Sequence, residues 1–234
     1  MLGPAALTHT TVIAQTSEPW IRWDWVSSHT DQILTALREH VILTLIAVVV
    51  GLLISIPLAL LARRWHWFEA PVLSATGILY TIPSIALLAL LVPWTGLTRT
   101  TAEIALVSYT LLILIRNIVA GLAGVPPDVR EAAEGMGYTP TRQFRRVELP
   151  LALPVIIAGI RIAVVTTIGL VTVTAVIGQG GLGQLILDGL IRDLRTEVVV
   201  GSVLCVALAT IADLMLMAIQ RIAMPWTRRS GDSR

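Results

Sequence analysis

Three charged residues lie within long apolar stretches, where the free-energy cost of a charge is high. They are Arg116, Arg161 and Asp213. At the centre of a membrane helix each costs about 2.5–3.5 kcal/mol on the insertion scale, so each is expected to have a partner. At 1.5 Å per residue, all three fall within about 9–14 Å of the same membrane face. We therefore predict an ion cluster that ties three helices together. The alternative is a proton relay, although a single acid has no second acid to receive a proton.

A second polar group interrupts an apolar stretch near its middle. It consists of Tyr80, Thr81, Pro83 and Ser84. Proline in a membrane helix frees backbone groups, and hydroxyls at the same depth can satisfy them. The pattern has two interpretations, a packed kink or a break that lines a transport pathway.

The remaining chemistry-bearing residues form no catalytic or metal-binding pattern. Four histidines are scattered along the chain, and the one cysteine, Cys205, lies in an apolar run. The glycine-rich segment GQGGLG at 178–183 follows an apolar span and not a strand, which argues against a nucleotide-binding loop. We expect a tight turn there, followed by a short, partly re-entrant helix over 185–190. The sequence therefore predicts no catalytic residue, no metal site and no cofactor, and the chain is not expected to be an enzyme.

The elements that hold these residues are predicted to be membrane helices. The chain of 234 residues is 55% hydrophobic and 14% charged, and its mean hydropathy is +0.80. These values place it among all-α integral membrane proteins. Apolar positions at helical spacing over 30–38 predict an interfacial helix ahead of the first span. Five transmembrane helices, each able to cross about 30 Å of hydrocarbon, are predicted over 40–62, 70–92, 102–122, 152–177 and 198–220.

Charge placement predicts how the chain sits in the membrane. If the polar loop at 131–150 is cytoplasmic, ten arginines lie on the inner side and five on the outer side, which favours an N-terminus outside and a C-terminus inside. All seven tryptophans fall outside the predicted spans, as expected for the membrane interface. This arrangement predicts an extracytoplasmic polar segment over 1–29, a transmembrane domain over 30–221 and a cytoplasmic tail over 222–234.

The most distinctive polar segment is EAAEGMGYTPTRQFRRVELP at 131–150. Asp128 and Glu131 have the spacing of an N-cap box, which predicts a first short helix. Gly137 allows a sharp bend, and Thr139 followed by proline predicts the start of a second helix. The leucine–proline pair at its end is expected to stop that helix. The segment is thus predicted to be helix, bend, helix.

The order of residue types in this segment resembles the cytoplasmic signature loop of binding-protein-dependent ABC import permeases, which share a methionine-permease-like transmembrane fold. In that family the loop is a pair of coupling helices that sits in a cleft of the ATPase subunit. The resemblance implies the same role for the matching residues, which are Glu131, Ala132, Ala133, Gly137, Arg142, Arg145, Leu149 and Pro150.

Further segments resemble the osmoprotectant branch of that family, whose members import glycine betaine, choline, carnitine and related compounds. These segments are YTIPSIALLALLVP at 80–93, LIRN at 114–117, VELPLALPVIIAGIR at 147–161 and IGQGGLGQLIL at 177–187. The resemblance implies a multi-pass protein of the bacterial cell membrane, in contact with membrane lipid. Its implied partners are an ABC ATPase subunit, a second permease subunit of the same or a related chain, and a solute-binding protein, with no nucleic acid.

Two alternatives remain open at this point. Permeases that import methionine and other amino acids share the coupling loop, so an amino-acid importer is one alternative. A proton-coupled secondary transporter, based on the three intramembrane charges, is the other.

Overall fold

The computed structural model describes residues 20–224, and all regular structure in that range is helical. Residues 1–19 of the predicted N-terminal segment and 225–234 of the predicted tail lie outside the described residues. The helices are α1 (Trp23–Ser28), α2 (Thr30–Arg64), α3 (His66–Thr81), α4 (Ser84–Thr95), α5 (Arg99–Ala123), α6 (Pro127–Gly135), α7 (Pro140–Gln143), the π-helical η1 (Phe144–Glu148), α8 (Leu149–Val173), the 3₁₀-helical η2 (Thr174–Ile177), α9 (Leu182–Ile191) and α10 (Arg195–Ala223).

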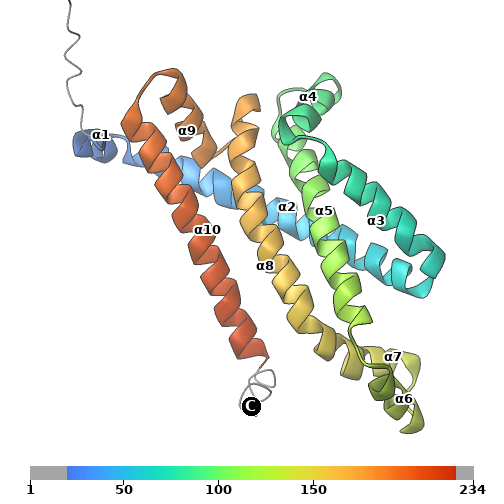
Figure 1. Cartoon of the computed structure of the whole chain (residues 1–234). Helices are drawn as coiled ribbons and strands as arrows, with labels where there is room; N and C mark the ends of the chain where they lie inside the picture. The colour runs from blue at the N-terminus through green and yellow to red at the C-terminus, as the bar shows by residue number, and fades with distance from the viewer. Residues whose placement is uncertain (1–19, 225–234) are drawn as a thin grey trace, which may run out of the picture.

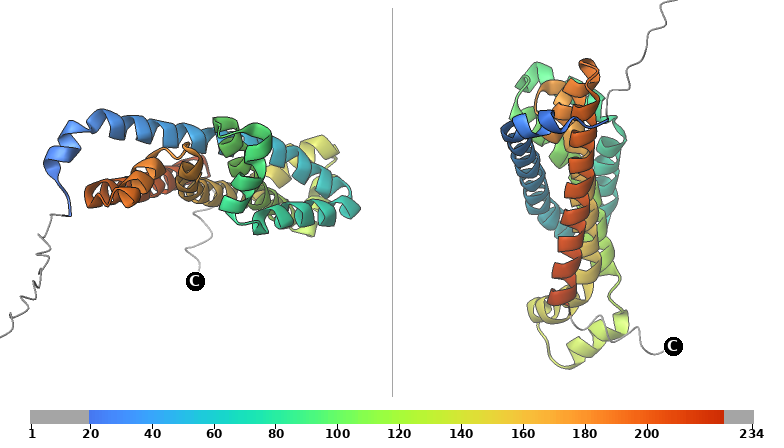
Figure 2. Two further views of the ribbon diagram at one scale, coloured as in Figure 1. Left: turned by 90° about the horizontal axis from the view of Figure 1, so that it is seen from above. Right: turned by 90° about the vertical axis from the view of Figure 1, so that its left-hand side faces the viewer.

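The helices form a flattened bundle. In Figure 1, α5, α8 and α10 have similar tilts, with α8 antiparallel to the other two, while α2 crosses behind them. The view from above in Figure 2 shows the bundle as an elongated row. Within the described residues, α2, α5, α10 and the continuous helix over 140–177 are each long and apolar enough to cross a membrane. The bent pair of α3 and α4 makes a fifth span if the two are counted together. The predicted all-α membrane fold is confirmed, with four or five candidate spans.

The helix predicted over 30–38 is present, but it is continuous with the first span and is not an element ahead of it. These residues form the first turns of α2, which runs without a break for 35 residues. Ile33 and Ala36 are buried against Leu182 and Leu185 of α9. The helical spacing of apolar residues that suggested contact with the membrane surface therefore reflects contact with another helix.

The second predicted span, 70–92, is broken and not continuous. α3 and α4 meet at an angle of 95°. Ile82 and Pro83 between them have extended backbones, because the residue before a proline is hindered in the helical region and proline has no N–H to donate. The carbonyl of Ile82 accepts a hydrogen bond from the hydroxyl of Tyr109 on α5. Packing against α5 therefore holds the bend.

α5 is the centre of the core, since it packs against α2, α3, α4 and α8. Buried side chains from these helices meet it in two large groups, one made with α2, α3 and α8 and one with α4 and η2. Gly159 of α8 lies directly against Asn117 of α5, and a Cβ at that position would overlap the asparagine side chain. A small residue there lets the two helices approach closely, as is common between membrane helices.

The predicted glycine turn at 178–183 is found between α8 and α9. Gly178 and Gly181 both have a positive φ, of 75° and 53°, which glycine adopts without the steric cost that a side chain brings. The short helix that follows, α9, runs over 182–191, a little longer than the 185–190 predicted. It packs against α10 and the N-terminal part of α2.

Candidate functional site

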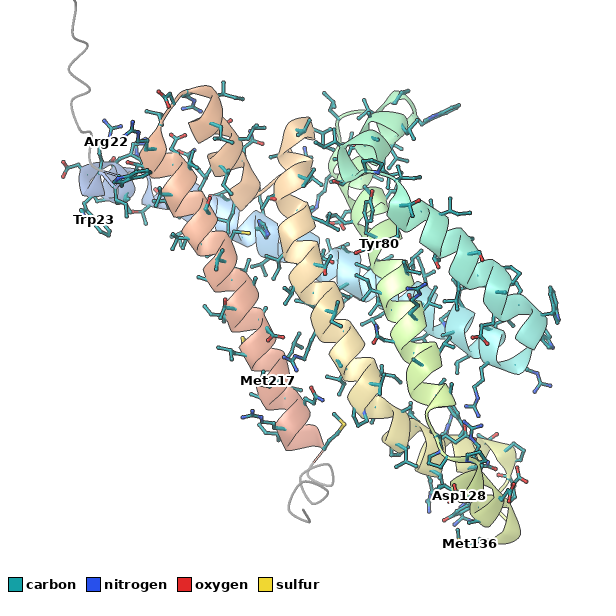
Figure 3. The ribbon with its side chains drawn as sticks, in the orientation of Figure 1. Arg22, Trp23, Tyr80, Asp128, Met136 and Met217 are labelled. Atoms are coloured by element: carbon teal, nitrogen blue, oxygen red, sulfur yellow. The ribbon has the colours of Figure 1, made fainter. Side chains whose placement is uncertain are left out.

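The two-helix loop projects beyond one end of the bundle. α6 and α7 lie past the ends of α5 and α8 (Figure 1). Figure 3 places Asp128 and Met136 at this tip, at the opposite end of the molecule from Arg22 and Trp23. The short helical pair is therefore accessible to a partner protein at that end of the spans.

α6 does not begin with the predicted N-cap box. Pro126 occupies the N-cap position and Pro127 the first helical position, with no side-chain hydrogen bond to the helix end. Proline fits there because the N–H that it lacks has no partner within the helix. Asp128 instead lies in the first turn, where its charge is favourable toward the helix dipole. Glu131 is left exposed.

α6 is amphipathic over the Glu-Ala-Ala triplet. Ala133 is fully buried at 0% exposure, whereas Glu131 and Ala132 are exposed. The buried alanine anchors the helix to the rest of the loop, so the other two side chains face outward, where a partner could contact them.

Gly137 makes the turn between α6 and α7. Its φ is 75°, in the left-handed region where an L-residue with a side chain costs about 1–2 kcal/mol. Apart from Gly137 itself and its two neighbours in the chain, no atom of the described residues lies within 4 Å of the place where a Cβ would stand. The backbone conformation, and not crowding within the chain, therefore requires glycine here.

α7 begins where the threonine–proline pair predicts. Thr139 occupies the N-cap position, without a side-chain cap bond, and Pro140 is the first helical residue. Arg142 and Arg145 are both exposed, and the guanidinium of Arg142 lies over the ring of Tyr138 at 4.5 Å from the ring centre. This contact fixes one arginine across the turn.

The prediction that Leu149 and Pro150 stop the second helix is wrong. α7 continues through the π-helical turn η1 into α8, so residues 140–177 form one continuous helix. In η1 the N–H of Leu149 reaches back to the carbonyl of Phe144, five residues earlier. The wider turn accommodates Pro150, whose ring would clash with a carbonyl four residues back in an ordinary α-helix. The second helix of the loop is therefore continuous with a membrane span.

The intramembrane charges are brought together only in part. Arg161 of α8 donates two hydrogen bonds to Asp213 of α10, at 2.8 Å from Nε and 2.9 Å from Nη2. Two parallel bonds of this kind are the strongest arrangement for an arginine and a carboxylate. The pair borders a groove of about 480 Å³ lined also by Ile162, Val165 and Thr166. It joins α10 to α8.

Arg116 does not join this pair, so the prediction of a three-residue cluster is wrong. Arg116 is exposed, and it makes no ion pair within residues 20–224. It shares one face of α5 with Ala120 and Ala123, which are also exposed, whereas Ile115 and Ile118 turn toward the core. Equal depth in the membrane therefore does not bring charges together unless they also lie on facing sides of their helices.

The four residues at 80–84 surround the break between α3 and α4. Tyr80 is 40% exposed and its ring meets that of Tyr109 edge to face, with 5.8 Å between centres. Thr81 and Pro83 are exposed, while Ser84 is partly buried against α5 and α8. The segment is thus a true break in the helix, with polar groups on its open side.

Sequence reasoning missed a polar cluster at the base of the loop. Glu148 is 4% exposed; its carboxylate forms an ion pair with Arg63 at the end of α2 and accepts a hydrogen bond of 3.3 Å from the side chain of Gln143. Arg63 also lies over the ring of Phe144, 5.5 Å from its centre. The available signal was an acid directly before an apolar span, in a segment otherwise rich in arginine.

The geometry agrees with what the comparisons show. The profile of one family, described as "Binding-protein-dependent transport system inner membrane component", matches residues 47–229. The chain belongs to this family. Among its relatives, an osmoprotectant import permease of Salmonella typhimurium is 40% identical over 192 residues, covering 80% of this chain and 89% of the relative. A choline transport system permease of Bacillus subtilis is 37% identical over 194 residues, covering 83% and 89%.

Solved structures show the same fold. An inward-facing form of the MetNI methionine ABC transporter has a chain that superposes with a TM-score of 0.73 at 24% identity, covering 83% of this chain and 97% of that one. The chain is therefore a multi-pass permease subunit with a methionine-permease-like fold. In transport systems of this family the ATPase and the solute-binding protein are separate partners, so the permease itself is not an enzyme.

Proposed function

We propose that this permease imports osmoprotectants of the quaternary-ammonium class, such as glycine betaine, choline and carnitine, with energy from a separate ATPase that docks on the 131–150 loop. The observation that carries the coupling role is the helical pair that projects past the spans and continues, through η1, into α8. The solute class rests on relatives at 40% and 37% identity whose names specify osmoprotectant and choline import.

The orientation proposed is the one that places this loop in the cytoplasm. Arg63 and Arg64 lie at the same end of α2, close to the loop, in agreement with an excess of arginine on the inner side. The N-terminus would then lie outside and the C-terminus inside.

A second permease chain, identical or related, is proposed to complete the pathway. Arg116 is exposed on α5, a candidate membrane span, and a charge in that position is costly against lipid. A facing chain, or a pathway holding water between the two chains, would remove that cost. The polar break at 80–84 is proposed as part of the pathway lining.

The two alternatives have weaker support. The likeness to methionine transporters is at 24% identity and concerns the fold, so it says little about the solute. A proton relay needs an acid that can exchange protons, but Asp213 is held by two hydrogen bonds from Arg161. That arrangement favours an ion pair that joins helices.

The test is uptake into proteoliposomes that contain this chain, its ATPase and its binding protein. We expect ATP-dependent accumulation of at least one of labelled glycine betaine, choline or carnitine, unaffected by a protonophore, with methionine as the comparison solute. Uptake of methionine alone would favour the amino-acid importer. Uptake without ATP that a protonophore abolishes would contradict the proposal.

A further inference from the structure

The base of the coupling loop holds a buried carboxylate that touches three parts of the chain. Glu148 is the last residue of η1, and its side chain is 5% exposed. It meets Arg63 of α2 as an ion pair, and Gln143 of α7 donates a hydrogen bond of 3.3 Å to its Oε1. One side chain therefore connects α7, the beginning of α8 and the end of α2.

The connection to α2 crosses a gap. A groove of about 680 Å³ lies between the end of α2 and the α7–η1 segment, lined in part by Leu60, Arg64 and Thr141. The Arg63 guanidinium spans this groove, next to the apolar cluster in which Ala59 of α2 and Ala152 of α8 are both buried. It contacts both the Glu148 carboxylate and, at 5.5 Å, the face of the Phe144 ring, two interactions that suit an arginine better than a lysine.

A second polar tie joins the same two helices at the other end of the bundle. His40 of α2 is fully buried, and its Nε2 donates to the backbone carbonyl of Ile168 on α8 at 3.0 Å, since a carbonyl can only accept. Along α2 the two ties are 23 residues apart, which is about 35 Å at 1.5 Å per residue. α2 and α8 are antiparallel, so each tie joins the ends that lie on the same side.

We propose that Glu148 and Arg63 are positioning residues that make α7, α8 and α2 move as one body when the ATPase moves the loop. The continuous helix over 140–177 carries the displacement of α7 into α8, and the Arg63–Glu148 bridge carries it into α2. Because the His40 hydrogen bond joins α2 to α8 at their other ends, the two helices are expected to move together. This proposal rests on the coupling role proposed for the 131–150 loop and adds the route by which motion reaches a second span.

The route predicts a specific defect when the bridge is cut. In Arg63→Ala and Glu148→Ala the ATPase still docks on α6 and α7 and still hydrolyses ATP, but α2 follows α8 less closely, because only apolar contacts join the two helices at this end. We expect the number of solute molecules taken up per ATP hydrolysed to fall about tenfold, at the lower end of the effect of removing a close charge pair. Arg64→Ala is the matched control, because Arg64 is the adjacent arginine and is exposed; it should behave as the wild type.

The experiment measures uptake of labelled choline or glycine betaine and ATP hydrolysis in the same proteoliposomes, together with the amount of ATPase that co-purifies. The exchanged pair Arg63→Glu with Glu148→Arg should restore solute per ATP to within about twofold of wild type, since the two charges again face each other. Arg63→Lys and Glu148→Gln are milder versions for use if the alanine variants give no protein, and each should lower the ratio.

Three results would overturn the proposal. The first is an unchanged ratio in Arg63→Lys and Glu148→Gln; the second is an exchanged pair that folds but stays as impaired as the single variants. The third is a loss of bound ATPase in proportion to the loss of uptake, which would assign Glu148 to docking. Failure of the proposed function looks different, because the wild type would then show no ATP-driven uptake of these solutes before any variant is compared.

Discussion

Gly137 offers a sharp test of how the loop meets the ATPase. Its φ of 75° is the source of the requirement for glycine, since only Gly137 itself and its two chain neighbours, among the described residues, have atoms within 4 Å of an added Cβ. A side chain in that backbone conformation costs about 1–2 kcal/mol, which corresponds to about 5–30-fold in an equilibrium constant. A β-branched residue tolerates it least, and asparagine tolerates it well. The strain falls on the turn and leaves the spans untouched.

We therefore expect Gly137→Val to weaken binding of the ATPase to the permease in nanodiscs by about 5–30-fold, with normal amounts of folded permease. Gly137→Asn should bind almost as well as the wild type. The matched control is Gly135→Val, because Gly135 is exposed, has no positive φ and has open space around its Cβ position. Equal losses in Gly137→Val and Gly137→Asn would mean that the ATPase approaches the glycine closely and needs the space. Unchanged affinity and coupling in Gly137→Val would refute the reasoning that the turn positions the docking helices.

Three further predictions follow from other parts of the chain. Asp213→Ala should lower the midpoint of thermal unfolding in detergent, and Asp213→Ala with Arg161→Met should recover part of the loss, because the double variant leaves no unpaired arginine at this site. Arg116→Ala, which removes a charge without a partner in the described residues, should leave the midpoint unchanged. An equal drop in all three variants would contradict the pairing. Gly159→Ala should destabilise the α5–α8 contact by about 1–3 kcal/mol through overpacking against Asn117, and Asn117→Ala should relieve it; a neutral Gly159→Ala would refute the close approach. In a background with Cys205→Ser, an impermeant thiol reagent applied to intact cells should label Leu97→Cys and not Thr141→Cys, both exposed positions at opposite ends of the spans; the reverse pattern would invert the proposed orientation.

The sequence determines the helices more clearly than their ends and faces. Apolar length identifies four of the spans but not the break that divides the predicted span 70–92 into α3 and α4. Residue order identifies the helical pair at 131–150. The leucine–proline pair was expected to end a helix, but a π-turn lets the chain continue, and such a turn depends on backbone hydrogen bonds that residue types do not specify. Likewise 30–38 forms a helix as expected, but whether it lies on a membrane or against α9 depends on a partner distant in the sequence.

The sequence predicts that a charge within a span has an ion-pair partner, but it does not predict which residue that partner is. The cost of a charge within an apolar span predicts that Asp213 has an arginine partner. Only the rotation of α5 shows why that partner is Arg161 and not Arg116. The Glu148–Arg63 contact joins residues 85 positions apart. No local sequence pattern predicts this pairing, since each residue is a charge next to a membrane span, where charges are common.

Cross-linking from the tip of the coupling loop tests the central claim most directly. Met136 is 69% exposed and lies at that tip. Leu97 is 64% exposed and lies just before the start of α5, whereas the coupling loop follows the other end of α5. With Cys205 replaced, Met136→Cys in the assembled transporter is treated with a short bifunctional thiol reagent, and the products are identified by mass. We expect a cross-link from Met136→Cys to the ATPase subunit and none from Leu97→Cys. A cross-link to the ATPase from Leu97→Cys, with none from Met136→Cys, would contradict the assignment of the 131–150 loop as the site where ATP hydrolysis is coupled to transport.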